Sequence, residues 1–409
     1  TNAAHHLTLA GVKKASVSNV AISEYDGSAV KEAIQIETLH SSSGTPECGP
    51  FDDTPSTDIV IYGNSFTDVP RGIGHHANVL GIDNTYILIK GNTFTDLPYQ
   101  AVLTTGMKHV RVLNNTMASV GLGVDAVITV HNSNKGVSQP NDFSWTASEL
   151  EEAGYTNRDI TISDNTISTT GSSSLTASEG YGDGISVRGM TFSAGTSSRV
   201  NMYAAGTYKI AGVRVKNNVI RSAHGVGIRL WKSTGCSATG NTVAKVASAQ
   251  GHSLGLYVSS STGATVSRNT VSSGAYRGIY ASNSSSGLSV SSNTFKGLTK
   301  AGVYATGSCS GVAVKSNLIV TSGSTAIRTK KHTYRAFRLT KKTRKALKGK
   351  TNSKAKVSIY VNGKKKKTVK AKKSGAFSHT FKKKQAKGAA LQLRYTNSQG
   401  NKIRANYVI

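Results

Sequence analysis

The hexapeptides GNSFTD (63–68) and GNTFTD (91–96) decide how this chain folds. An asparagine that follows an alternating strand recurs in this context, at Asn64, Asn92, Asn115, Asn165, Asn218, Asn241, Asn269, Asn293 and Asn317. Asn19 is expected to open the series. The base period is about 24 residues, with three longer intervals. A repeat of this length predicts stacked coils that share one core, with the asparagine amides hydrogen-bonded in a ladder.

A second strand begins with a small residue and then an apolar one, as in Ala33-Ile34, Gly72-Ile73, Ala101-Val102, Ala126-Val127, Gly184-Ile185 and Gly278-Ile279. Short strands without a helical period predict an all-β fold. Residues 1–329 resemble the right-handed parallel β-helix of the pectin-lyase-like superfamily, which hosts hydrolases, lyases, epimerases and adhesins. The chain starts directly in a strand-like pattern, so we expect a truncated N-terminal start.

The chain changes character after residue 329. Residues 330–350 are expected to be a basic linker. Residues 351–409 contain short strands separated by turns at Asn362-Gly363 and Ser374-Gly375, which predict a small β-sandwich. This segment resembles the Ig-like modules appended to secreted and surface proteins of bacteria. Three cysteines, Cys48, Cys236 and Cys309, predict free or buried thiols because they match no disulfide framework or zinc spacing.

The charge of the chain is distributed unevenly. The 409 residues carry a net charge of +30, but all 20 carboxylates lie at or before Asp183. Residues 184–409 hold 41 of the 50 Lys and Arg residues and no acid. Chemistry that needs an Asp or Glu must therefore lie in the first 183 residues. No run of ~20 apolar residues is present, so no membrane span is expected.

Alignment of the second strands predicts a polar row on one outer face of the coils. The residue before each small–apolar pair is polar in five successive coils: Glu32, Arg71, Gln100, Asp125 and Asp183. Coils stack ~4.8 Å apart, so we expect Asp125 and Asp183 to lie side by side. Two close carboxylates have different pKa values, which suits the acid and the nucleophile or base of a glycoside hydrolase. Asp125 and Asp183 are therefore the predicted catalytic pair.

Polar and aromatic residues near this row are the predicted substrate-binding residues: Glu32, Gln35, Arg71, His75, His76, Gln100, His131, Arg188, Arg229 and Trp231. Arg188 could hold a carboxylate ionised or bind an acidic sugar. Trp231 and a row of tyrosines could stack on sugar rings. Insertions at 39–57, 131–157 and 189–206 follow second strands, so we expect them to wall this face.

An upstream cluster joins Glu32–Glu37, Asp52–Pro55 and Pro70–His76. These segments resemble the repeat region of secreted bacterial β-helix proteins that are grouped with pectate lyases and glycoside hydrolases. Glu37, Asp52 and Asp53 are candidate ligands for Ca²⁺, a cation that prefers carboxylate oxygens. The alternative is that Asp53-Thr54-Pro55 forms a turn and that the two histidines are half-buried.

Three functions follow from these patterns. The first is a secreted enzyme that hydrolyses glycosidic bonds of a poly- or oligosaccharide with no cofactor. The second is a calcium-dependent lyase that acts on uronate-containing glycans. The third is a non-catalytic surface adhesin or wall-binding protein, although such a protein has no need for an aligned polar row.

The lysine runs Lys364–Lys367 and Lys382–Lys384 could indicate nucleic acid binding. The C-terminal residues lack the interleaved aromatic residues that stack on bases, so we expect no nucleic acid partner. An anionic cell-wall polymer is the predicted partner of this basic module. A secreted or surface-associated location agrees with that partner.

Overall fold

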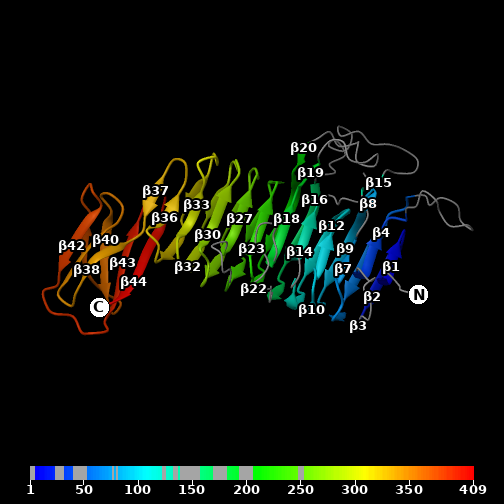
Figure 1. Ribbon diagram of the computed structural model, residues 1–409, viewed down its shortest axis with the longest axis horizontal. Coiled ribbons are helices and arrows are strands. Elements are labelled where there is room, and N and C mark those ends of the chain that lie inside the picture. Colours follow the sequence, from blue (N-terminus) through cyan, green and yellow to red (C-terminus); the bar gives the residue numbers. More distant parts are fainter. Residues whose placement is uncertain are drawn as a thin grey trace, which may run out of the picture.

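The computed structural model describes residues 5–23, 32–39, 53–75, 78–79, 82–121, 126–131, 137–138, 157–168, 182–192, 206–246 and 253–409. Within these ranges all regular secondary structure consists of β-strands. The described residues form no helix that is long and apolar enough to cross a membrane. The strands stack along one long axis, with the first coils at one end and the C-terminal strands at the other (Figure 1).

Three long sheets follow this axis. Sheet A contains β1 (His5–Ala10), β4 (Glu32–Glu37), β7 (Ile73–Gly74), β11 (Val102–Thr104), β14 (Ala126–His131), β18 (Asp183–Arg188), β23 (Val226–Trp231), β27 (Leu254–Ser259), β30 (Arg277–Ser282), β33 (Ala301–Ala305), β36 (Thr325–Arg328) and β37 (Thr333–Arg335). Sheet B contains β2 (Lys13–Ser18), β5 (Thr57–Tyr62), β9 (Asn84–Lys90), β12 (Met107–Leu113), β16 (Asn157–Ser163), β21 (Ile210–Lys216), β25 (Ser237–Thr239), β28 (Thr265–Ser267), β31 (Ser289–Ser291) and β34 (Ala313–Lys315), with β24 (Ser233–Thr234) beside β21.

Sheet C completes each coil. It contains β3 (Ala21–Ser23), β6 (Ser65–Thr67), β10 (Thr93–Leu97), β13 (Thr116–Val120), β17 (Thr166–Ser168), β22 (Val219–Ser222), β26 (Thr242–Val243), β29 (Thr270–Ser272), β32 (Thr294–Leu298) and β35 (Leu318–Thr321). Two short ladders, β8 (Asn78–Val79) with β15 (Val137–Ser138) and β19 (Met190–Phe192) with β20 (Gly206–Tyr208), lie outside these sheets. The chain visits sheets A, B and C in turn and pairs in parallel with the previous coil, so the expected parallel β-helix is confirmed.

The small–apolar signal has a steric cause. A Cβ added to Gly278 would lie 2.4 Å from a ring carbon of Phe295 and 2.6 Å from the carbonyl oxygen of Gly302. Gly72 meets Phe94 and the carbonyl of Ala101 in the same way. The residue at this position of each coil must be small because a side chain of sheet C packs directly against the backbone of sheet A.

The asparagine ladder lies at the turn between sheets B and C. The Asn241 Nδ2 donates to Asn269 Oδ1 and to Val215 O, both at 2.9 Å. Asn–Asn bonds of this kind join each asparagine from Asn64 to Asn317 to the next. The expectation for Asn19 is wrong, because the pairing of Ala21 with Ser65 places Val20 at the ladder position.

The C-terminal residues continue the solenoid. Sheet C is extended by β44 (Lys402–Val408), β43 (Ala390–Thr396), β40 (Lys356–Val361) and β41 (Lys364–Lys370), in that order. Strand β44 pairs in parallel with β35, and Asn317 Nδ2 donates to Asn401 Oδ1 at 2.9 Å. Asn401 is therefore a further member of the ladder, which the sequence pattern did not reveal.

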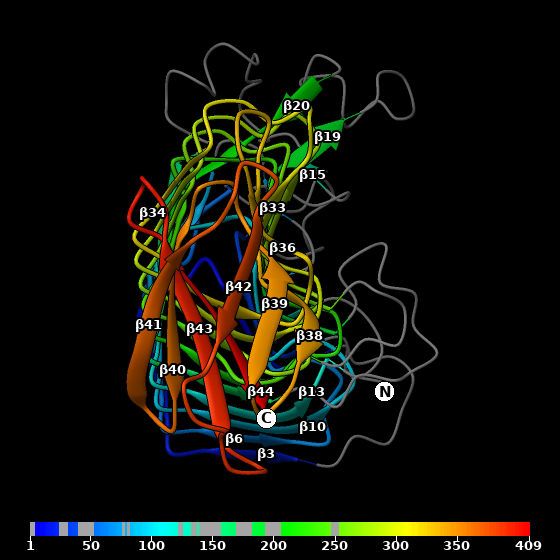
Figure 2. The same cartoon turned by 90° about the vertical axis from the view of Figure 1, so that its left-hand side faces the viewer.

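A second small sheet completes this end of the molecule. It contains β38 (Arg338–Lys342), β39 (Ala346–Lys350) and β42 (Ala376–Thr380). Figure 2 views this sheet and the extension of sheet C from the C-terminal end. Buried Phe337, Phe377 and Tyr395 pack edge to face between them. Within residues 330–350, β38 and β39 belong to this sheet and β37 pairs with β36 in sheet A, so this segment is not the expected linker.

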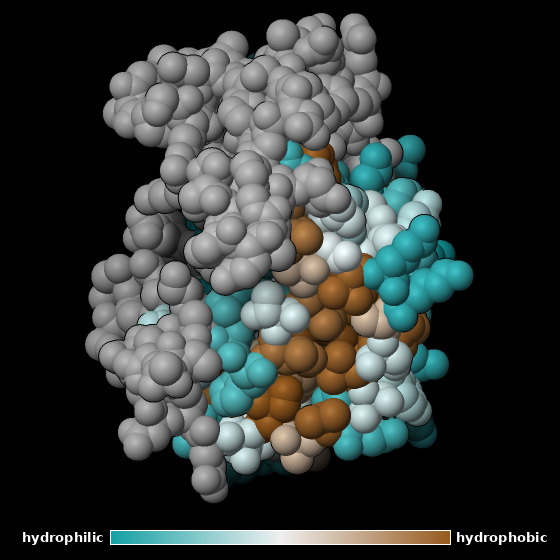
Figure 3. All heavy atoms as spheres, turned by 90° about the vertical axis from the view of Figure 1, so that its right-hand side faces the viewer, coloured by the Kyte–Doolittle hydropathy of each residue, from teal (hydrophilic) through white to brown (hydrophobic). Residues whose placement is uncertain are grey.

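The two ends of the solenoid differ. Figure 3 views the N-terminal end, where apolar side chains of the first coil gather at the surface. Leu9 there is buried, and Leu7, Val17 and Ile22 pack against the core while partly exposed. Further along the solenoid, Cys236 and Cys309 are free and buried, as expected, while Cys48 lies outside the described residues.

Candidate functional site

The outer face of sheet A carries most of the candidate residues. Pairing between strands places them in three rows along the solenoid. The first row holds His5, Glu32, Arg71, Gln100, Ala126, Asp183, Val226, Leu254, Arg277 and Ala301. The second holds Gln35, Gly74, Leu103, Thr129, Ser186, Arg229, Tyr257, Tyr280, Tyr304 and Arg328. The third includes His131, Arg188, Trp231, Ser259 and Ser282.

The register of β14 differs by one residue from the expected alignment. Ala126, and not Asp125, lies opposite Asp183. Val127 occupies the position that glycine or alanine fills in most coils. The pair that aligns with the small–apolar pairs of other coils is therefore Val127-Ile128 and not the expected Ala126-Val127. The expected placement of the two carboxylates in one row is therefore wrong. Asp125 itself lies outside the described residues, and its catalytic role stays a prediction.

Asp183 is fully buried beneath this face. Its Oδ2 accepts a hydrogen bond from Arg229 Nε at 2.5 Å. Its Oδ1 accepts from the Val226 N–H at 2.8 Å and from Arg229 Nη2 at 3.3 Å. Burial raises the pKa of Asp183 above its ordinary value, against the lowering effect of the Arg229 charge. Asp183 therefore fixes the position of Arg229 and ties β18 to β23.

A second ion pair lies near the N-terminal end of the same row. Arg71 Nη1 pairs with Glu32 Oε1, and Arg71 Nε donates to Gln100 Oε1 at 2.7 Å. His5 Nδ1 lies 3.2 Å from the other oxygen of Glu32. A Cβ on Gly74 would lie 2.9 Å from Arg71 Cδ, so this glycine makes room for the arginine. Three predicted substrate-binding residues, Glu32, Arg71 and Gln100, are thus brought together.

Arg188 and Trp231 are neighbours on adjacent coils. Arg188 pairs in register with His131 on one side and with Trp231 on the other. Its guanidinium carbon lies 5.9 Å from the centre of the Trp231 ring, and its Nε donates to Ser186 Oγ at 2.7 Å. Lys232 Nζ lies 4.7 Å from the same ring. The indole and its cationic neighbours are within cation–π distance.

An aromatic track continues from these residues toward the C-terminus. We define it as Tyr257, Tyr280, Tyr304, Arg277 and Arg328. The rings of Tyr257 and Tyr280 stack with centroids 5.5 Å apart, and Tyr304 follows at 5.8 Å. The Arg277 guanidinium lies 4.7 Å from the centres of the Tyr280 and Tyr304 rings. Arg328 lies 5.3 Å from Tyr304 and is exposed.

The arginines of the track were not predicted as site residues. Arg277 belongs to the first row and Arg328 to the second, so their position in the repeat could have revealed them. No Asp or Glu occurs beyond residue 183 to neutralise them. Three neighbouring tyrosine rings lie beside the guanidinium groups of Arg277 and Arg328, which form no ion pair with a carboxylate among the described residues. This arrangement suits a ligand with both apolar ring faces and acidic or hydroxyl groups.

The upstream candidates are only partly described. Glu37 is half-buried at the end of β4, and Asp53 and His75 are buried. Asp52 and His76 lie outside the described residues, so the predicted calcium site stays a prediction. Across the described part of the chain, no group of three or more His, Cys, Asp or Glu residues is arranged to hold a metal.

Comparison with known proteins agrees with the fold. The family model "Right handed beta helix region" matches residues 153–319. The surface protein and adhesin PfbA of Streptococcus pneumoniae is 16% identical with a TM-score of 0.40; the match covers 76% of this chain and 64% of that one. A tailspike protein of E. coli bacteriophage HK620, solved with a pentasaccharide, is 11% identical with a TM-score of 0.41 and coverage of 98% and 70%.

The A-module of mannuronan C-5 epimerase AlgE6 from Azotobacter vinelandii is 12% identical, with a TM-score of 0.27 and coverage of 73% and 79%. A search of curated protein sequences finds no match.

Proposed function

We propose that this chain is a carbohydrate-active protein that binds a polysaccharide along the outer face of sheet A and hydrolyses its glycosidic bonds. The observation that carries the proposal is the aromatic track, in which three consecutive coils present neighbouring tyrosine rings beside Arg277. Aromatic rings pack against the apolar faces of sugars, and fixed guanidinium groups donate to their hydroxyl and carboxylate oxygens.

The direction of the track supports a polymeric ligand. The track runs along the solenoid axis and joins Arg229, Trp231 and the Asp183 pair at its N-terminal end. A glycan chain laid on the track therefore passes the buried carboxylate before it reaches the Glu32–Arg71 pair. Stacking of one sugar on each coil would align the scissile bond with these charged groups.

Asp183 is the proposed proton donor, with Asp125 as the second carboxylate. A general acid benefits from a raised pKa, and burial raises the pKa of Asp183 above its ordinary value. Arg229 contacts both oxygens of Asp183, so its guanidinium would stabilise the carboxylate that proton transfer leaves behind.

A non-catalytic glycan-binding surface protein is the second candidate. The observation in its favour is that Asp183 is fully buried and that both of its oxygens already accept hydrogen bonds. Such a carboxylate orders the binding face without taking part in chemistry. A calcium-dependent lyase differs from both candidates because removal of Ca²⁺ by a chelator would abolish its activity.

Incubation of the full chain with polygalacturonate, alginate, xylan and β-glucan, with and without EDTA, separates these functions. Hydrolysis predicts new reducing ends that EDTA does not affect and that Asp183→Asn reduces at least 100-fold. An EDTA-sensitive absorbance from unsaturated uronides would indicate the lyase. Binding without product would favour the surface protein. If Tyr280→Ala weakens binding no more than the control Tyr360→Ala, the sheet A site is wrong.

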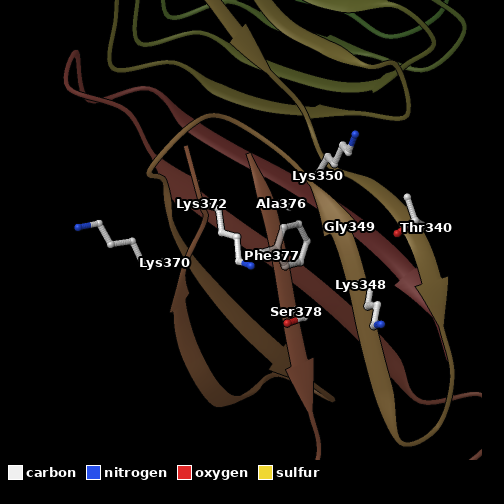
Figure 4. Close-up of a pocket in the computed structure, with 9 residues that line it drawn as sticks. All are labelled: Thr340, Lys348, Gly349, Lys350, Lys370, Lys372, Ala376, Phe377 and Ser378. Carbon is white, nitrogen blue, oxygen red and sulfur yellow. The ribbon is translucent and has the colours of Figure 1, made fainter. Parts of the chain in front are cut away.

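The basic C-terminal unit is the proposed attachment site for an anionic cell-wall polymer, which implies a secreted or surface location. A pocket of ≈ 350 Å³ lies there, lined by Lys348, Lys350, Lys370 and Lys372. Figure 4 shows the Lys372 side chain beside the ring of Phe377, with Lys348 and Lys350 on the neighbouring strand and Lys370 directed away. Co-sedimentation with teichoic-acid-bearing cell walls that falls steeply with added salt would support this attachment.

A further inference from the structure

A corner of sheet B changes character halfway along the molecule. Each of ten successive coils places one residue there with φ between 42° and 71°. The ten residues are Lys14, Asp58, Tyr86, His109, Asp159, Gly212, Gly235, Gly263, Gly287 and Gly311. The last five coils use glycine, which tolerates this backbone, whereas the first five carry side chains at a steric cost.

Three of these side chains belong to one polar network. Asp159 Oδ2 lies 3.0 Å from His109 Nδ1 and accepts from Arg111 Nη2 at 2.8 Å. Asp159 Oδ1 accepts from Arg214 Nη1 at 2.9 Å. The His109 ring stacks on Tyr86 with centroids 4.8 Å apart and planes 7° apart. One carboxylate therefore holds two arginines and a histidine beside a stacked aromatic ring.

This cluster faces solvent. Tyr86 is 59% exposed, and Tyr62 on the preceding coil of sheet B is 48% exposed. The side chain of Arg214 is 57% exposed, and those of Arg111 and His109 are 39% and 33% exposed. With two guanidinium groups and one carboxylate, the charge of the cluster is positive at neutral pH.

The fold itself does not require this network. In the row of Arg111 and Arg214, the later coils carry Ser237, Thr265 and Ser289. Those coils have glycine at the corner, and they stack through the same asparagine ladder. Side chains that cost backbone strain, lie at the surface and are not needed for stacking point to a binding role.

We propose that Tyr86, His109, Arg111 and Arg214 form a second glycan-binding surface, on sheet B and separate from the sheet A site. The exposed ring of Tyr86 packs against the apolar face of one sugar residue, and its stack with His109 keeps it rigid. The exposed N–H groups of Arg214 donate to hydroxyl or carboxylate oxygens of the same sugar. Asp159 is a positioning residue that holds both arginines.

The test uses the full chain with Tyr257→Ala, Tyr280→Ala, Tyr304→Ala, Arg277→Gln and Arg328→Gln, which together remove the aromatic track. Titration calorimetry with hexamers of galacturonic acid and of β-1,4-linked glucose should show residual binding to at least one probe. Adding Tyr86→Ala or Arg214→Gln should weaken this binding about tenfold. The control Tyr360→Ala removes a tyrosine that lies 4.0 Å from Arg394 at the far end of the molecule.

Two results would overturn the second surface. One is that neither hexamer binds the background variant. The other is that Tyr86→Ala and Arg214→Gln leave the residual affinity equal to that of the Tyr360→Ala control. Residual binding that depends on Tyr86 would stand even if the sheet A face proved to bind no glycan, so the two sites are tested separately.

Discussion

Single carboxylates organise the charged surfaces of this protein. Asp183 places Arg229 on sheet A, Glu32 places Arg71, and Asp159 gathers three donors on sheet B. In each case an arginine is held by a carboxylate from a neighbouring coil. Cross-coil pairs of this kind convert flexible side chains into fixed donors, which lowers the entropy lost on ligand binding.

Asp159 gives the residue-scale prediction for pH. Burial opposes its ionisation, but hydrogen bonds from Arg111, His109 and Arg214 hold the pKa of this carboxyl well below its ordinary value of 3.8. The associated stability is present above that ordinary pKa and is lost as pH falls below it. We expect Asp159→Asn to lower Tm at pH 6 and to have a smaller effect at pH 3. An effect of equal size at both pH values would contradict this.

Asn241→Ala tests the ladder at the same scale. The variant removes the acceptor of the Asn218 N–H, one of the acceptors of Asn218 Nδ2, and the hydrogen bonds that Asn241 Nδ2 donates to Asn269 and Val215. Buried groups without partners cost about 1–3 kcal/mol each, so we expect a loss of about 3 kcal/mol in the free energy of unfolding. Denaturant titration measures it, with the exposed Asn406→Ala as control.

At the scale of elements, the small residue near the start of each sheet A strand determines how closely sheets A and C approach each other. Glycine at the second strand position lets a branched or aromatic side chain of sheet C contact the backbone. The corner position of sheet B differs, since the first five coils carry a residue other than glycine there although glycine would be less strained. The same coil geometry therefore supports packing in one place and surface chemistry in another.

Gly278→Ala is expected to destabilise the protein by about 2 kcal/mol, because the added methyl group overlaps the Phe295 ring and a carbonyl oxygen. Gly307→Ala is a matched control, since nothing lies within 4 Å of its added Cβ. Thermal or denaturant unfolding of both variants measures the difference. Equal stabilities would show that the two sheets can separate to make room.

At the scale of the whole molecule, charge and structure are both polarised. All carboxylates occur within the first 183 residues of the sequence, while the C-terminal unit is rich in lysine and closes the solenoid through β44 and Asn401. Strand β41 lies at the edge of sheet C with four successive exposed lysines. Lysines on an edge strand oppose edge-to-edge association with another chain.

Deletion of residues 330–409 is expected to expose the last coil, because β35 loses its pairing with β44 and Asn317 loses the acceptor that Asn401 provides. We expect a lower Tm and concentration-dependent association in size-exclusion chromatography. A truncated chain that remains monomeric with unchanged Tm would show that the C-terminal unit is dispensable for stability.

The repeat pattern alone was enough to predict the β-helix, its period and nearly all of its ladder, since every coil repeats the same packing requirement. It also placed Glu32, Arg71 and Gln100 in one row, and Arg188 beside Trp231, because register follows from period. The predicted row was wrong at Asp125, because this coil has Val127 at the position where most coils have glycine or alanine. A one-residue slip changes which side chain is a neighbour without changing the fold.

How the polar residues combine depends on contacts that the repeat pattern does not predict. Sequence spacing could not show that Asp183 is buried against Arg229, that Arg277 stacks on tyrosines of two coils, or that Asp159 gathers donors from neighbouring coils. Long side chains choose partners among several rows and coils, and that choice depends on rotamers and local space. Backbone periodicity is a property of the repeat, whereas a site is a property of particular side chains brought together by stacking.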